Sequence, residues 1–200
     1  FIREEQRHAA TLAGYMRDHG LPLREREATD RVFRRLRRLA GFELAVSVLL
    51  TAELMGIQFY RALLRSTGSR RLRAICTTFL QDEALHVAYE SELLLALRAR
   101  RGRWLGGALA AAHLAFHVAA ALVVWFAHRR VLRAAGHSAW EFPRTCARHY
   151  ALYLWPPRTG PRLVAEAVAR ATPPIAPEAG RDAARAWAAR RPLRPRPPER

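Results

Sequence analysis

The fold is decided by residues 49–88, LLTAELMGIQFYRALLRSTGSRRLRAICTTFLQDEALHVA. Apolar side chains recur at helical spacing on both sides of the short polar stretch 66–69. We therefore predict two helices, at about 42–66 and 70–100. A connection this short makes the two helices an antiparallel hairpin.

Two glutamates occupy equivalent positions in this hairpin. Glu53 lies 15 residues before Gly68, and Glu83 lies 15 residues after it. At ~1.5 Å per residue, each glutamate is about 22 Å from the turn. Both carboxylates are therefore expected at the same height in the bundle.

A first helix is predicted over 1–19, where apolar residues again recur at helical spacing and Gly20 provides a stop. Glu5 is likewise 15 residues before Gly20. The connection over 20–41 is long enough to return a full helix length, so the first two helices can run parallel. A third carboxylate is then expected at the same level as the other two.

Two of the three glutamates belong to Glu-x-x-His motifs, Glu5 with His8 in EEQRH and Glu83 with His86 in DEALH. Positions i and i+3 lie on one face of a helix, so each motif offers a carboxylate and an imidazole to the same side. Glu53 has apolar neighbours, among which an unpaired carboxylate would carry a large desolvation cost. These five residues are the candidate metal ligands.

EEQRH, the Glu of LLTAELMG, and DEALH together resemble the ferritin-like di-iron carboxylate superfamily. Its pattern is Glu, Glu-x-x-His, Glu, Glu-x-x-His on four successive helices, and the resemblance covers about residues 1–100. It implies an all-α, ferritin-like antiparallel helix bundle lacking its first helix, with additional C-terminal helices. Since the sequence opens on Phe1 inside a helical pattern, we expect an upstream helix that carries the sixth ligand.

The resemblance implies two iron ions, with manganese as the other metal to consider. Glu4 and Asp82 directly precede the motif glutamates, and by the same resemblance each would orient the imidazole of the opposite helix. A surface carboxylate is the other reading of both. The ligands implied for the metals themselves are Glu5, His8, Glu53, Glu83 and His86.

Mixed carboxylate and imidazole ligation suits iron or manganese and leaves positions open for dioxygen. We expect an oxygenase or hydroxylase that uses dioxygen, a small organic substrate and a separate electron donor. A ferroxidase, or another ferritin-like iron protein without an organic substrate, stays open because the fold alone does not choose. The two cysteines, Cys76 and Cys146, form no Cys-x-x-Cys pair and are expected to be free, buried thiols in a reducing cytoplasm.

No residue from Trp104 to Phe126 carries a formal charge. The segment is long and apolar enough for a membrane span, but His113 and His117 lie near its middle. A buried or interface-lying helix is therefore preferred, and membrane association through 104–126 stays open. We expect the two histidines to pack or form hydrogen bonds rather than bind metal.

These patterns divide the chain into a metal-binding bundle over 1–102, an extension of one apolar and one amphipathic helix over 103–155, and a Pro/Arg-rich, partly disordered tail over 156–200. Within this division, a short basic helix is expected at about 30–39 and the amphipathic helix at about 138–154.

The chain of 200 residues has 34 basic and 17 acidic residues, a formal net charge of +17. Such a surface favours acidic partners or acidic membranes. No specific nucleic acid is predicted, because no known reader motif appears. A non-catalytic, helical, Arg-rich interaction or membrane-associated protein is the alternative of another class, and a homodimer also stays open.

Overall fold

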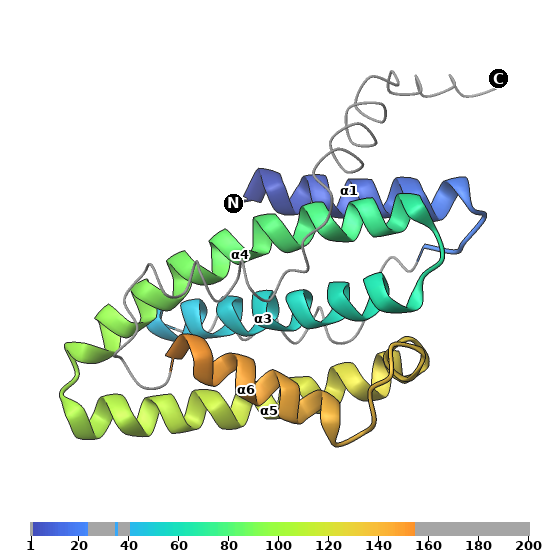
Figure 1. The fold of residues 1–200 in the computed structure, drawn as a ribbon. Helices are drawn as coiled ribbons and strands as arrows, with labels where there is room; N and C mark the ends of the chain where they lie inside the picture. Colours follow the sequence, from blue (N-terminus) through green and yellow to red (C-terminus); the bar gives the residue numbers. More distant parts are fainter. Residues whose placement is uncertain (1, 24–34, 36–40, 155–200) are drawn as a thin grey trace.

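The computed structural model describes residues 2–23, 35 and 41–154, and within these residues it contains helices and no strand. The all-α class is confirmed for this part of the chain. The tail over 156–200 and, apart from residue 35, the predicted helix at 30–39 lie outside the described residues. The helices are α1 (Ile2–Asp18), α3 (Phe42–Ser66), α4 (Arg70–Ala99), α5 (Arg103–Ala134) and α6 (Glu141–Leu154), as Figure 1 shows.

Helices α3 and α4 form the predicted antiparallel hairpin. The turn between them is fixed by its own polar groups. The Ser69 hydroxyl caps α4 by accepting a hydrogen bond from the Leu72 amide at 3.3 Å. The Arg73 guanidinium donates to the Leu64 carbonyl at 2.6 Å, which satisfies an oxygen that the end of α3 leaves without a helical partner.

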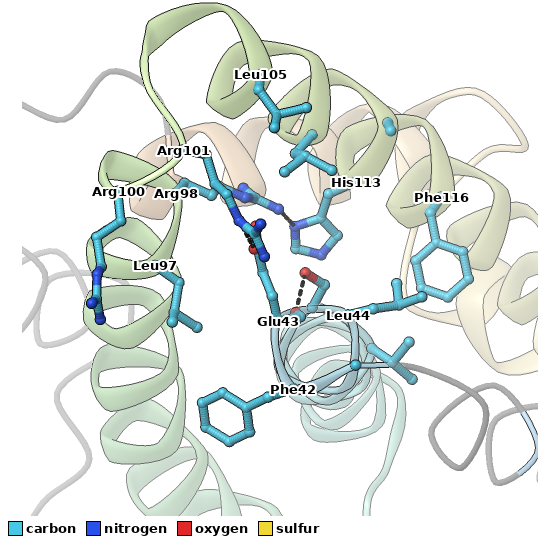
Figure 2. Close-up of a pocket in the computed structure, with 15 residues that line it drawn as sticks. Phe42, Glu43, Leu44, Leu97, Arg98, Arg100, Arg101, Leu105, His113 and Phe116 are labelled. Atoms are coloured by element: carbon cyan, nitrogen blue, oxygen red, sulfur yellow. Dashed lines mark hydrogen bonds and ion pairs between the residues drawn. The ribbon is translucent and has the colours of Figure 1, made fainter.

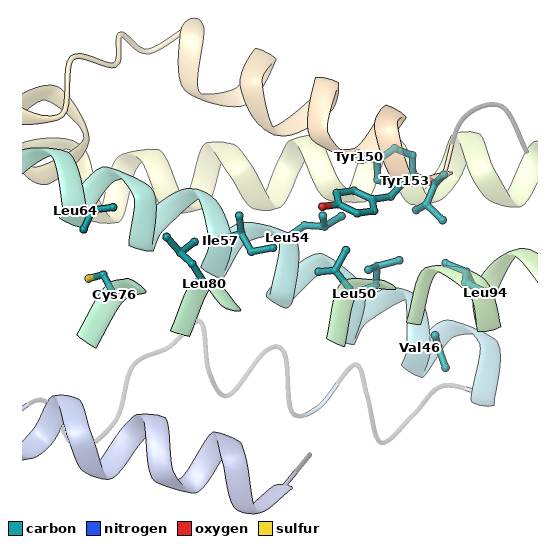
Figure 3. Close-up of a cluster of buried hydrophobic side chains, with 12 residues drawn as sticks. Val46, Leu50, Leu54, Ile57, Leu64, Cys76, Leu80, Leu94, Tyr150 and Tyr153 are labelled. Carbon is teal, nitrogen blue, oxygen red and sulfur yellow. The ribbon is translucent and has the colours of Figure 1, made fainter. Parts of the chain in front are cut away.

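The main hydrophobic core lies between α3, α4 and α6 (Figure 3). Each of these helices contributes side chains that are almost fully buried, and the two tyrosines of α6 complete the cluster. Burial of this apolar surface is the main force holding the three helices together. The core consists of Val46, Leu50, Leu54, Ile57, Leu64, Cys76, Leu80, Val87, Leu94, Tyr150, Tyr153 and Leu154.

Helix α5 packs along α3 and α6, where Trp125, Phe142 and Cys146 belong to a second buried cluster. The helix runs beyond the predicted apolar segment to Ala134, and its backbone departs from helical angles at His128 (φ −120°, ψ 19°). Helices α5 and α6 thus share buried cores with the α3–α4 hairpin. Both predicted buried thiols, of Cys76 and Cys146, are buried and free.

A glycine allows α5 to begin close to the end of α4. A Cβ atom at Gly106 would lie 2.9 Å from the carbonyl oxygen of Arg98, closer than real Cβ atoms approach. Gly106 therefore lets the two backbones meet, and this contact fixes the part of α5 that faces α4 and α3. The side chain of Arg98 is itself buried at this contact.

Two described helices, α3 and α5, are long and apolar enough to cross a membrane. In the most apolar window, 56% of the residues of α3 are buried against 28% of those of α5. Helix α3 is covered because it lies between α4 and α5. Helix α5 keeps an uncovered apolar face that includes Leu122, Val123 and Phe126.

Helix α1 packs against α4 and runs parallel to α3, as predicted (Figure 1). The helix ends at Asp18, and Gly20 just beyond it has a φ of 64°, the left-handed conformation that glycine adopts without strain. An ion pair of 2.7 Å between Asp18 and Arg71 ties this end to α4. The helix buries only His8 and Tyr15, and both of these side chains carry polar groups.

Candidate metal centre

Four of the predicted ligands meet between α1, α3 and α4. Glu5, Glu53, Glu83 and His86 each offer one ligand atom, and these atoms all lie within 4.8 Å of one another. Glu53, Glu83 and His86 are buried, while the side chain of Glu5 is 43% exposed. The expected common level of the three glutamates is thus what the structure shows, and the group is able to hold a metal ion.

Glu83 faces a different histidine with each of its carboxylate oxygens. Its Oε1 lies 3.2 Å from Nδ1 of His8, and its Oε2 lies 3.1 Å from Nδ1 of His86. Oε1 of Glu5 lies 3.8 Å from both of these nitrogens. Although His8 falls outside the group of four, it completes a symmetrical arrangement with two carboxylates between two imidazoles.

The outward nitrogen of each imidazole meets an acid from the opposite helix. Nε2 of His8 lies 2.9 Å from Oδ2 of Asp82, and Nε2 of His86 lies 3.1 Å from Oε2 of Glu4. The two acids thus lie where the sequence analysis expected them. An imidazole that donates its Nε2–H to a carboxylate carries its lone pair on Nδ1. The lone pairs then point toward Glu5 and Glu83.

Glu53 supplies the carboxylate from α3. Burial and a hydrogen bond with Glu83 raise the pKa of Glu53 to about 11. Burial would also raise the pKa of Glu83, but the contacts with His8, Glu53 and His86 hold it at about 2. Without a metal, Glu53 therefore carries a proton that it shares with an ionised Glu83.

Two buried atoms at the centre of this group lack hydrogen-bond partners, as expected of a place that a cation can occupy. These atoms are Oε1 of Glu5 and Nδ1 of His8. Nδ1 of His8 is close to Glu83, but two acceptor atoms 3.2 Å apart repel each other unless a proton or a metal lies between them. Burial would lower the pKa of His8, yet Glu83 and Asp82 raise it overall, which favours a proton at this place in the metal-free protein. A metal ion can replace that proton.

Aromatic rings cover one side of the group. The Phe79 ring packs on the His8 ring with centroids 4.0 Å apart, and Tyr60 meets Phe79 edge-on at 5.2 Å. Burial, with the charges of Glu83 and Glu5, raises the pKa of the Tyr60 hydroxyl. The rings therefore keep water from the His8 side of the group.

Glu90 was not singled out in the sequence analysis. It is buried, its Oε2 lacks a partner, and burial with the charges of Glu83 and Glu5 raises its pKa to about 8. Seven residues separate it from Glu83, so two helical turns place both on one face of α4. That spacing was the signal that could have found it.

His113 and His117 form hydrogen bonds in the interior and are distinct from the candidate metal centre. Nε2 of His113 lies 3.0 Å from the Thr51 hydroxyl, and Nε2 of His117 lies 3.2 Å from the carbonyl oxygen of Cys146. This agrees with the expectation that the two histidines pack or form hydrogen bonds.

The chain was compared with known proteins in three ways. No protein-family model matches the sequence, no curated protein matches it, and no solved structure matches the fold. The resemblance to the ferritin-like superfamily therefore rests on the motif residues quoted above.

Proposed function

We propose that this chain holds two metal ions, iron or alternatively manganese, and activates dioxygen for the oxygenation or hydroxylation of a small organic substrate. The observation that carries the proposal is the position of Glu83, whose two oxygens face two different imidazoles at 3.2 and 3.1 Å. One carboxylate between two nitrogen donors suits a pair of metal ions that share it. Glu5, whose Oε1 lies 3.8 Å from both nitrogens, would be the second carboxylate to hold the two ions.

The remaining residues have complementary roles. His8 and His86 would each bind one ion through Nδ1, held in place by Asp82 and Glu4 respectively. Glu53 would be a terminal ligand once its proton leaves, and Phe79 would keep water away from His8. Bound iron supplies the redox chemistry with dioxygen that none of these side chains can perform.

The donor set supports iron or manganese over zinc. Structural zinc sites are closed tetrahedra, most often of cysteine and histidine ligands, whereas this group is rich in carboxylates. The two cysteines are buried elsewhere in the fold, Cys76 in the main core and Cys146 in the second cluster. Carboxylate oxygens also suit the positive charge of two adjacent cations, since Glu5, Glu53 and Glu83 supply three negative charges once Glu53 is deprotonated.

Elemental analysis of the full-length protein after reconstitution with iron under anaerobic conditions tests the proposal. We expect iron at close to two per chain, and its loss in Glu83→Ala and His86→Ala. Glu92→Ala is the matched control, because Glu92 is exposed on the same helix. Substoichiometric iron and manganese in the wild-type protein would remove the proposal.

A ferroxidase is the second candidate for the same centre, favoured by the 43% exposure of the Glu5 side chain, which gives ions a route from solvent. Dioxygen consumption separates the two activities. A ferroxidase consumes dioxygen in proportion to added Fe²⁺, well beyond the bound stoichiometry. An oxygenase needs an electron donor and turns over with catalytic iron only.

Membrane docking through α5 is a variant of the proposal, favoured by the uncovered apolar face around Phe126, which is 65% exposed. A docked enzyme would take its substrate from the lipid phase. Carbonate extraction and detergent partitioning of the full-length protein test this variant. Recovery of all the protein in the aqueous phase would remove it.

A further inference from the structure

A cavity of about 830 Å³ lies between the start of α3, the end of α4 and the start of α5, at the end of the hairpin opposite the 66–69 turn (Figure 2). Its volume is in the range of small-molecule sites. The walls are largely apolar and include Leu44, Val48, Leu97, Leu109 and Phe116. Its polar side chains come from α3, from the end of α4 and the residues just beyond it, and from α5: Glu43, Ser47, Arg98, Arg100, Arg101 and His113.

Arg98 lines this cavity, although it is only 7% exposed. Its Nη2 lies 2.8 Å from Nδ1 of His113, and its Nη1 donates to the Tyr150 hydroxyl at 3.5 Å. Burial and Arg98 lower the pKa of His113 to about 3, so this imidazole is neutral at physiological pH. Both partners of the guanidinium are therefore uncharged.

The positive charge of Arg98 has no counter-ion among the described residues. The cavity contains one carboxylate, that of Glu43, and it pairs with Nε of Arg101 at 3.1 Å. The Nε–H of Arg98 is buried and has no hydrogen-bond partner. A buried charge left in this state is costly unless an anion joins it.

We propose that this cavity binds a long-chain carboxylate, with its head group on Arg98 and its alkyl chain along the apolar walls. A guanidinium has five N–H donors and binds a carboxylate through two parallel hydrogen bonds. Two of the donors of Arg98 are engaged, and its Nε–H is free for the ligand. The carboxylate of Glu43, whose Oε1 also lacks a partner, disfavours a dianion such as a phosphate monoester.

The site is independent of the proposed metal centre. Arg98 lies 15 residues beyond Glu83 along α4, which is about 22 Å at ~1.5 Å per residue. Neither the cavity lining nor the contacts of Arg98 include a candidate metal ligand. Loss of metal binding would therefore leave this proposal standing, and the reverse also holds.

Isothermal titration calorimetry with dodecanoate, below its critical micelle concentration, tests the proposal on the full-length protein. Dodecanol and dodecyl phosphate are the comparison ligands. We expect saturable binding of dodecanoate, and binding of dodecanol at least about tenfold weaker, because a hydrogen-bonded charge pair is lost. Equal binding of dodecanol, tighter binding of dodecyl phosphate, or no binding of dodecanoate would overturn it.

Arg98→Met and Arg100→Met form a matched pair, because each removes one positive charge and Arg100 lies exposed at the rim. We expect Arg98→Met to weaken dodecanoate binding at least about tenfold and Arg100→Met less than about threefold. Equal effects would mean that only the net charge matters, which contradicts the assignment.

Exposed Leu105 gives a second pair that does not disturb the interior. Leu105→Glu should weaken dodecanoate binding more than Leu105→Gln, because only glutamate repels the carboxylate. If Arg98→Met fails to fold, the two Leu105 variants test the proposal instead. Identical dodecanoate affinities of Leu105→Glu and Leu105→Gln would overturn it.

Discussion

The α3–α4 hairpin carries two buried polar groups of opposite charge. Near its middle, Glu53 and Glu83 meet Glu5 of α1 and leave acceptor atoms without partners. At its far end, Arg98 meets only neutral partners and leaves a donor without one. The first group lacks positive charge, and the second lacks negative charge.

Burial alone therefore does not identify a binding site. The charge of the buried group that lacks a partner indicates whether a cation or an anion would bind there. Both groups contain a histidine next to the charge. His8 faces carboxylates and its pKa is raised, whereas His113 faces an arginine and its pKa is lowered to about 3. The same type of side chain is therefore paired with acids in one place and with an arginine in the other.

Glu53→Gln is expected to cause the largest loss of metal affinity. The amide keeps the shape of the side chain and can donate a hydrogen bond to Glu83, but it cannot become an anion. We expect the affinity for Mn²⁺ to fall by more than about 100-fold, beyond the loss typical of groups that only orient a ligand. Competition with a fluorescent chelator measures this, and an affinity within threefold of wild type would rule out Glu53 as a ligand.

Asp82→Asn should have the next largest effect. The carboxylate of Asp82 holds the Nε2–H of His8 at 2.9 Å, and groups of this kind contribute about 10–100-fold to metal affinity. The same titration with Mn²⁺ measures the loss. Asp18→Asn is the control, since Asp18 forms a surface ion pair with Arg71 and lies ten residues along α1 from His8. Equal affinities of the two variants would contradict the assigned role.

Glu90→Gln should stabilise the metal-free protein in a pH-dependent manner. The pKa of Glu90 is raised from 4.5 to about 8, so folding keeps it protonated at pH values where the unfolded chain is ionised. This costs stability increasingly from about pH 4.5 to pH 8, at up to ~1.4 kcal/mol per pH unit. Urea unfolding should show a gain for the variant at pH 8 and almost none at pH 4.5. A gain of equal size at both values would exclude ionisation as its cause.

Arg98→Met should leave metal affinity within about twofold of wild type, the smallest effect expected here. The guanidinium is too far along α4 for its charge to act strongly on the carboxylates through a partly solvated interior. Mn²⁺ titration of the variant tests this. A change above tenfold would show that the two polar groups are coupled.

Much of the fold was predictable because its signals are local. Helical periodicity gave the ranges of α1, α3 and α4, and the short 66–69 turn gave the antiparallel hairpin. Equal spacing from Gly68 placed Glu53 and Glu83 at one level, as the structure confirms. Helix length and turn length were sufficient for this part of the candidate site.

The burial of Arg98 was not predictable from the sequence, because it depends on how α5 and α6 pack against α4. Nothing in the sequence around Arg98 distinguishes it from the exposed Arg100 or Arg101. Its burial follows from the approach of α5 at Gly106 and from the position of Tyr150 on α6, which is 52 residues away along the chain. The seven-residue spacing places Glu90 on the same face of α4 as Glu83, but the burial of Glu90 depends on how the other helices cover that face.

Under the proposed function, two metal ions would share Glu83. X-ray absorption at the iron edge of the reconstituted full-length protein tests it most directly. The account predicts a metal neighbour at ~3.5–4 Å, the separation of known two-metal sites, together with oxygen and nitrogen ligands, and its loss in Glu83→Ala. An iron shell of oxygen and nitrogen without a metal neighbour at full loading would contradict the account.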